Sequence, residues 1–261
     1  IAAGGQHTLA LKADGTVIAW GSNSAGQLGD GTQVSRSSPG PVNGLAGVSE
    51  VAAGYFHSIA LAGDGTLWSW GYNYQGVLGQ GDQDQRNTPT RIAGLPLVAS
   101  FAMGAGHTLA LGRDGTVWAF GTNGSGQVGD GSTTDRFSPV QVTGLANVTA
   151  LAGGGNHSLA LRADGTVWSW GKNYSGELGD GTNTDRSRPA PVPGLTGVVA
   201  IAAGDSFSFA LKADGTVLAW GANWSGQLGD GSGLEKTSPT PVPALASIAS
   251  LSGGGTGAMA L

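Results

Sequence analysis

Residues 157–171 read HSLALRADGTVWSWG, and this stretch returns along the chain at a fixed interval of 50 residues. The other full copies begin at His7, His57, His107 and Phe207, and a truncated copy, LSGGGTGAMAL, ends the chain. Self-similarity at a period of roughly 20 to 50 residues is the signature of a repeat architecture. The histidine, aspartate and tryptophans of this stretch therefore belong to a repeated structural unit rather than to a single reactive site.

Each unit is predicted to form four short antiparallel strands. In the second unit we expect them at residues 51–54, 57–61 and 66–71 and around 90–92, with a long polar loop over residues 72–89. The Asp64-Gly65 pair is a strong hairpin signal and predicts a type I′ turn, which needs positive φ at both residues. Strands that are apolar on both faces, without helical periodicity, are typical of the blades of a β-propeller. The sequence therefore predicts an all-β propeller of four-stranded antiparallel blades.

We expect one propeller domain over residues 1–261. Its repeats are residues 1–50, 51–100, 101–150, 151–200 and 201–250, with a partial one at residues 251–261. The first two strands of the unit occur six times and the last two occur five times. Five full repeats and a half repeat leave open a closed five- or six-bladed ring or part of a seven-bladed one, and we favour a window from a longer array.

Composition excludes several classes of function. The formal net charge is −5, and no basic run is longer than a pair, which argues against nucleic acid as a partner. The absence of cysteine excludes disulfides and thiolate metal sites. No stretch approaches the ~20 apolar residues of a membrane-spanning helix, so we expect no membrane insertion. Catalytic motifs such as a Ser-His-Asp arrangement, a Walker loop or HExxH do not occur, so we expect neither an enzyme nor a cofactor.

Polar residues that recur in every unit are explained by the fold. The histidines His7, His57, His107 and His157 share one register, and equivalent positions of neighbouring blades lie ~10 Å or more apart, too far to meet on one metal. We expect them to be buried and bonded to nearby backbone. The recurring tryptophans Trp20, Trp70, Trp170 and Trp220 are expected between blades, and the cations Arg36, Arg86, Arg136, Arg186 and Lys236 are expected to brace the long loops. Calcium at Asp130 with Asp135, or at Asp180 with Asp185, remains an alternative.

Positions that differ between units are the better candidates for function. They lie after the first strand, after the WG pair and before the loop proline, and antiparallel strand order brings all three regions to one end of the blades. Exposed aromatic side chains on rigid loops are typical of protein-recognition surfaces, although some of them could instead pack beneath the loops. The candidate partner-binding residues are Tyr55, Phe56, Tyr72, Tyr74, Phe137, Asn156, Tyr174 and Trp224.

The units also carry a signature: G-x-x-H-[ST]-L-A-L, then D-G-x-[VL]-x-x-W-G, then N-x-x-G-Q-L-G-x-G, then a proline. This pattern resembles the RCC1 repeat (regulator of chromosome condensation) over the whole chain, and the resemblance implies a β-propeller. The family includes a nuclear exchange factor for a small GTPase and a secreted bacterial inhibitor of β-lactamases. The uniform units have no insertion that could serve as the wedge of the exchange factor, so we carry over no exchange residues. The clean glycine- and threonine-rich units resemble bacterial relatives, so we expect a non-enzymatic protein-binding scaffold of bacterial type, secreted or on the cell surface. Carbohydrate or small-ligand binding is the alternative, and guanine-nucleotide exchange on a small GTPase is less favoured.

Overall fold

Each 50-residue unit forms one antiparallel sheet of four strands that follow one another in chain order, as the sequence predicts. The structure, a computed structural model, describes residues 1–245 and 248–261. Blade 1 consists of β1 (Ala2–Ala3), β2 (His7–Leu11), β3 (Val17–Gly21) and β4 (Arg36–Pro41). Blade 2 consists of β5 (Val48–Ala53), β6 (His57–Ala62), β7 (Leu67–Gly71) and β8 (Arg86–Arg91), with the short 3₁₀ helix η1 (Tyr74–Gly76) in its long loop.

The remaining blades repeat this pattern. Blade 3 consists of β9 (Val98–Met103), β10 (His107–Gly112), β11 (Val117–Gly121) and β12 (Arg136–Val142). Blade 4 consists of β13 (Val148–Gly153), β14 (His157–Arg162), β15 (Val167–Gly171) and β16 (Arg186–Pro191). Blade 5 consists of β17 (Val198–Ala203), β18 (Phe207–Lys212), β19 (Val217–Gly221) and β20 (Lys236–Pro241), and a hairpin of β21 (Leu251–Gly254) and β22 (Gly257–Ala260) follows it.

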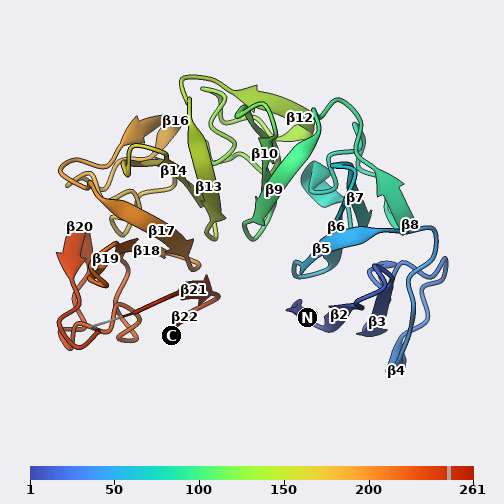
Figure 1. Ribbon diagram of the computed structural model, residues 1–261. Coiled ribbons are helices and arrows are strands. Elements are labelled where there is room, and N and C mark those ends of the chain that lie inside the picture. Colours follow the sequence, from blue (N-terminus) through green and yellow to red (C-terminus); the bar gives the residue numbers. More distant parts are fainter. Residues whose placement is uncertain (246–247) are drawn as a thin grey trace.

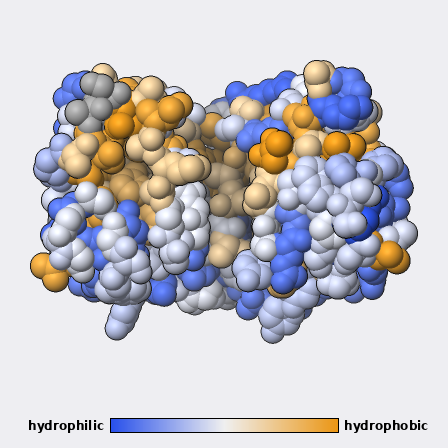
Figure 2. Space-filling view, turned by 90° about the horizontal axis from the view of Figure 1, so that it is seen from below, coloured by the Kyte–Doolittle hydropathy of each residue, from blue (hydrophilic) through white to orange (hydrophobic). Residues whose placement is uncertain are grey.

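The blades stand around an open arc (Figure 1). The first strand of each blade lies toward the middle of the arc and the fourth lies at its periphery, and the two termini lie on either side of the gap (Figure 1). The hairpin β21–β22 packs against β17 and β18 of blade 5. Seen through the gap, the centre is hollow and apolar side chains occupy parts of both flanks (Figure 2). The arrangement is thus an arc rather than a closed ring of five or six blades.

The fourth strand is longer than the sequence suggests. In blade 2 it begins at Arg86 instead of near residue 90, and it pairs with β7 through Gly71 opposite Arg86 and Ser69 opposite Thr90, with a bulge between. Its residues are polar and include Pro89, a composition typical of loops. Because β8 is an edge strand, one row of its backbone groups needs no partner in the sheet, so a proline and polar side chains are tolerated there.

The Asp-Gly hairpins have a different turn from the expected type I′. In blade 1, Gly15 N–H donates to the Lys12 carbonyl at 3.0 Å and Lys12 N–H donates to the Thr16 carbonyl at 2.9 Å. Only Gly15 has a positive φ, of 78°, while Asp14 does not. This is a three-residue loop whose last residue is left-handed. The Asp14 carboxylate accepts hydrogen bonds from the Thr16 N–H at 3.0 Å and the Thr16 hydroxyl at 2.6 Å, which confirms a turn role for this aspartate.

A repeated set of hydrogen bonds joins neighbouring blades. At the junction of blades 1 and 2, the Gln27 carbonyl accepts from Trp70 Nε1 at 2.9 Å and from Ser58 Oγ at 2.9 Å. His7 Nε2 lies 2.9 Å from the same Ser58 Oγ. Because the serine hydroxyl hydrogen goes to the carbonyl, the imidazole must donate from Nε2. We call this set the inter-blade clasp. It recurs with His107, Ser158, Gln127 and Trp170 between blades 3 and 4, and with His157, Ser208, Glu177 and Trp220 between blades 4 and 5.

The histidines are therefore structural, as predicted, but the partner of His7, His107 and His157 is a serine side chain of the next blade and not nearby backbone. All four are buried, and burial lowers the pKa of His7, His57 and His107 to about 4 and that of His157 to about 3. The glycine of the G-x-x-H motif makes room for the ring, because a Cβ on Gly54 would lie 2.4 Å from His57 Cε1. The motif is thus a packing requirement of the buried imidazole.

The junction of blades 2 and 3 lacks the clasp. Thr108 and Phe120 stand where the other clasps have serine and tryptophan. In the part of the chain that the structure describes, His57 Nε2 and Thr108 Oγ1 have no hydrogen-bond partner although both atoms are buried. An apolar cluster that includes Ile59, Phe101 and Phe120 joins these two blades instead. Buried polar groups without partners lower the stability of the fold, so restoring the clasp residues at this junction should increase the free energy of unfolding.

We expect the double variant Thr108→Ser, Phe120→Trp to stabilise the chain by about 1–2 kcal/mol, because each restored hydrogen bond contributes about 1 kcal/mol. A glycine packs against the ring in both blades, since a Cβ on Gly79 would lie 2.7 Å from Phe120 and one on Gly129 would lie 2.6 Å from Trp170. Urea denaturation followed by circular dichroism measures the gain. A double variant less stable than the parent chain would show that the clasp does not account for the stability of the other junctions.

Candidate partner-binding face

The long loop of each blade is braced by its own side chains. In blade 1 the buried Asn23 accepts from Leu28 N–H at 2.8 Å and donates to Asp30 Oδ1 at 3.2 Å, and Asp30 forms an ion pair with Arg36 at 3.2 Å. The predicted bracing role of the recurring cations is confirmed by the pairs Arg36–Asp30, Arg86–Asp82, Arg136–Asp130, Arg186–Asp180 and Lys236–Asp230. In blade 5 the Ser232 N–H, together with the Ser232 hydroxyl, lowers the pKa of Asp230 to about 2. These contacts brace each long loop through its own side chains.

The aspartates that raised the calcium alternative have partners within their loops. Asp135 accepts from the Asn123 N–H and Asp185 from the Asn173 N–H, each at 2.8 Å. No group of three or more metal-ligating side chains gathers within residues 1–245 and 248–261. Calcium therefore receives no support from the loop geometry.

Four of the predicted residues come together at one end of blade 2. The ring centroids of Tyr55 and Phe56 lie 4.9 Å apart, those of Phe56 and Tyr72 lie 6.2 Å apart, and those of Tyr72 and Tyr74 lie 6.2 Å apart. Tyr55 is 64% exposed and Tyr74 is 59% exposed, whereas Phe56 is half-buried. We call these four residues the tyrosine ridge. Edge-to-face contacts of Phe56 with Tyr55 and Tyr72 hold these rings in place, while the outer surfaces of the tyrosines face solvent.

The other predicted residues are distributed differently. Tyr174 and Trp224 are exposed on the equivalent loops of blades 4 and 5. Asn156 is exposed, and its Oδ1 accepts from Gln127 Nε2 at 3.1 Å. Phe137 is half-buried and packs beneath the loop of blade 2, since a Cβ on Gly76 would lie 2.5 Å from its Cδ1. Phe137 is thus the case in which an aromatic side chain packs under a loop.

Strand order brings these loops to a common side. Each blade is an antiparallel sheet with strands in chain order, so the connections after the first and third strands leave from the same end. We call this side the loop face. The Asp-Gly hairpins and the turns between blades lie at the opposite end. The tyrosine ridge, Asn156, Tyr174 and Trp224 all belong to connections of the loop face.

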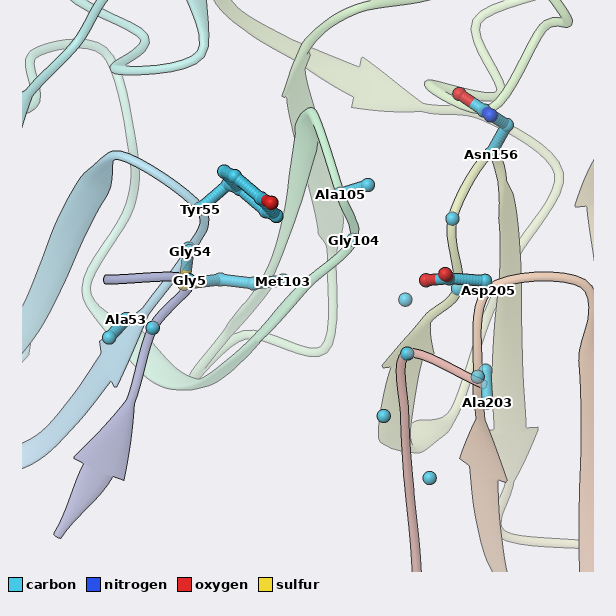
Figure 3. A pocket seen from close by; sticks show the side chains of 18 of the residues that line it. Gly5, Ala53, Gly54, Tyr55, Met103, Gly104, Ala105, Asn156, Ala203 and Asp205 are labelled. Carbon is cyan, nitrogen blue, oxygen red and sulfur yellow. The ribbon is translucent and has the colours of Figure 1, made fainter. Parts of the chain in front are cut away.

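A central cavity of about 710 Å³ lies where the first strands of the blades end. Its walls are mostly glycine and alanine, among them Gly54, Gly104 and Gly154. Tyr55 and Asp205 occupy the same register in blades 2 and 5, and their side chains project into the cavity from opposite sides (Figure 3).

Asp205 was not among the residues that sequence reasoning selected. Its register reads Gly5, Tyr55, Ala105, Gly155 and Asp205 in the five units. The sequence therefore contained a sign that Asp205 is a candidate functional residue, because it is the one charged residue where the other units have glycine, alanine or tyrosine. Only the arc brings Asp205 and Tyr55, 150 residues apart in sequence, to one cavity.

Among the described residues no helix has the length and apolar character that crossing a membrane requires.

Comparisons with known proteins agree with this architecture. The chain has a TM-score of 0.86 and 28% identity to human WBSCR16, covering 98% of this chain and 69% of that one. Prp20p from Saccharomyces cerevisiae, described together with its binding to Gsp1p and histones, has a TM-score of 0.81 and 23% identity over 96% of this chain and 65% of its own. Yeast RCC1 (Prp20) bound to Kap60 has a TM-score of 0.76 and 21% identity over 98% and 78%. The chain thus spans about two thirds of the first two of these structures.

The two yeast structures, at less than 25% identity, establish the fold alone. A family model supplies the stronger link, because the model for the RCC1-like domain matches residues 1–260. That match covers nearly the whole chain and agrees with the repeated signature in the sequence. The chain therefore belongs to the RCC1-like domain family.

Proposed function

We propose that this chain is a non-enzymatic protein-binding scaffold that recognises its partner through the loop face. The observation that carries the proposal is the tyrosine ridge, in which Tyr55, Tyr72 and Tyr74 are exposed on loops fixed by internal hydrogen bonds. Tyrosine and tryptophan are enriched at the centres of protein interfaces because they bury a large area at a small cost in side-chain entropy. Tyr174 and Trp224 extend the same chemistry over blades 4 and 5.

Two further observations support this proposal. The loops differ between units at these positions, whereas the framework beneath them is repeated, so the sequence of the face is free to suit a partner. Structures with the same fold are described in complexes or binding studies with other proteins: Prp20p with Gsp1p and histones, and yeast RCC1 with Kap60. The partner of this chain is to be identified by experiments on the loop face.

Carbohydrate binding is the second candidate because exposed rings also stack on sugars. The planes of Tyr72 and Tyr74 are inclined by 35°, so the pair does not form one flat platform. A glycan array decides the matter: binding of a glycan that Tyr74→Ala abolishes would favour this candidate. Guanine-nucleotide exchange is tested by nucleotide release from a small GTPase, and stimulated release would contradict a purely binding role.

The protein-binding proposal predicts position-specific crosslinking. We expect a photoreactive p-benzoylphenylalanine at position 74 to form a light-dependent adduct with one protein from the native source. The same photoreactive amino acid at position 97 should form no such adduct. Leu97 is also exposed, at 51%, but it lies in a connection at the opposite end of the blades.

With that protein identified by mass spectrometry and purified, the double variant Tyr55→Ala, Tyr74→Ala should bind it at least tenfold more weakly in calorimetry. The matched control Leu97→Ala, which also removes an exposed apolar side chain, should bind within twofold of the parent chain. Equal weakening by both variants, or equal adducts at both positions, would overturn the assignment of the loop face.

A further inference from the structure

We propose that the mouth of the central cavity binds a basic side chain, arginine or lysine, that the partner protein projects into it, with Asp205 as the counter-ion and Tyr55 as the opposite wall. This inference rests on the proposed function, because it assigns a chemical character to the partner of the loop face. It goes beyond that function by naming the group that enters the cavity and the residues that hold it.

The cavity carries a negative charge at its edge. Asp205 carries the one charged side chain among the residues found to line it. Its carboxylate makes no hydrogen bond or ion pair with any residue in the described ranges 1–245 and 248–261, whereas the loop aspartates such as Asp30 are paired with cations. An unpaired carboxylate at the edge of a hollow attracts a cation, and the net charge of −5 adds to that attraction.

The backbone holds Asp205 in place for this role. Its N–H donates to the Gly255 carbonyl at 2.8 Å, and its own carbonyl accepts from the Gly155 N–H at 3.0 Å. A Cβ on Gly155 would lie 2.5 Å from that carbonyl oxygen, so the neighbouring blade approaches too closely for a larger residue. The carboxylate is therefore presented from a fixed backbone at the junction of blades 4 and 5.

The wall opposite Asp205 is aromatic. The Tyr55 ring packs over Gly5, where a Cβ would lie 3.0 Å from Tyr55 Cγ, and against Phe56 at 4.9 Å. Both side chains point toward the middle of the cavity (Figure 3). An aromatic face opposite a carboxylate is a favourable setting for a guanidinium or ammonium group, which is attracted by the ring and by the charge together.

The dimensions fit a long side chain rather than a bare ion. The cavity has a volume of about 710 Å³, and most of the described residues that line it are glycine and alanine, whose small side chains leave room between Tyr55 and Asp205. A calcium ion would need about six to eight oxygen ligands, and the lining side chains supply one carboxylate. The tyrosine ridge runs from this cavity to the outer loop of blade 2, so a partner seated on the ridge has the cavity within reach of its side chains.

The test uses the full chain labelled with ¹⁵N and two neutral-backbone probes, N-acetyl-arginine methylamide and N-acetyl-citrulline methylamide. We expect the arginine probe to produce saturable shifts of the Asp205, Gly155 and Gly255 amide signals. Citrulline has nearly the same shape without the charge and should bind at least tenfold more weakly. Asp205→Asn should remove the preference for arginine, and Tyr55→Leu should weaken arginine binding at least threefold.

The matched control is Asp84→Asn, which removes one negative charge from an exposed loop of the same face without touching the cavity. Asp84→Asn should retain the preference for arginine, which separates a local site from a general effect of net charge. Equal shifts by both probes, or a preference that survives Asp205→Asn, would overturn the proposal.

Affinity measurements with the purified partner distinguish the basic-side-chain proposal from the loop-face proposal on which it rests. If Tyr55→Ala, Tyr74→Ala lowers partner affinity and Asp205→Asn does so at least tenfold, both proposals are supported. If Asp205→Asn binds the partner like the parent chain while the tyrosine variant does not, the basic side chain is excluded and the loop face stands. If neither variant loses affinity, the loop face itself is the wrong surface.

Discussion

Replacing Trp170 by alanine is expected to lower the free energy of unfolding by about 3–5 kcal/mol. The indole is fully buried in a cluster with Leu109, Val128 and Val142, and its Nε1 donates to the Gln127 carbonyl of the preceding blade at 2.8 Å. Alanine would leave a large cavity between blades 3 and 4 and an unpaired carbonyl. Urea denaturation followed by far-ultraviolet circular dichroism measures the loss.

Two further variants show which part of the tryptophan matters. Trp170→Phe keeps an apolar ring, as Phe120 does at the equivalent position of blade 3, and should cost about 1–2 kcal/mol through the lost hydrogen bond and the smaller ring. Trp224→Ala removes an indole that is 64% exposed and should change stability by less than about 0.5 kcal/mol. A loss at Trp170 no larger than that at Trp224 would contradict the role of the clasp.

Mild acid is expected to destabilise the chain strongly between pH 7 and pH 4. Burial lowers the pKa of His7, His57 and His107 to about 4 and of His157 to about 3, while the unfolded chain binds these protons near pH 6.5. The unfolded state therefore takes up more protons as the pH falls, and the stability present above pH 6.5 is lost progressively. At pH 5 the loss is about 2 kcal/mol for each histidine. Burial raises the pKa of Glu50 and of Glu177, and these two carboxyl groups oppose the trend.

The variant His57→Phe isolates one of these contributions. His57 Nε2 has no partner among the described residues, and Phe207 already occupies the same register in blade 5, packed against Gly204 as His57 is against Gly54. The variant should resemble the parent chain at pH 7.5 and exceed it by about 2 kcal/mol at pH 5. Urea midpoints at three pH values provide the comparison. An unchanged pH dependence would mean that His57 is not held neutral by burial.

Much of the fold follows from the repeat alone. The 50-residue period, the Asp-Gly hairpins and the apolar second and third strands predict a four-stranded blade, and the structure confirms it. The misplaced start of β8 has a physical cause: an edge strand is stabilised by pairing with β7, so its own side chains need not look like a strand. The turn type was wrong because Asp-Gly suits a three-residue loop as well as a two-residue one, and the flanking register chooses between them.

The candidate face was predictable in outline, because variation between units at Tyr55, Tyr72 and Tyr74 stands out against a constant frame. Its internal geometry was not. Contacts such as Tyr55 with Phe56 and Phe56 with Tyr72 depend on how the first and third connections of one blade lean toward each other. The burial of Phe137 depends on the loop of the neighbouring blade, which no pattern within its own unit describes.

Local periodicity and turn chemistry, which repeat in every copy, were enough to predict the unit, its strands and the residues that are free to vary. Tertiary structure alone decided what happens between units. It set the serine partners of His7, His107 and His157, each 51 residues away. It also set the missing clasp between blades 2 and 3 and the meeting of Tyr55 with Asp205 at one cavity. These depend on the angle and spacing at which whole blades pack, which side-chain volumes from two units fix jointly.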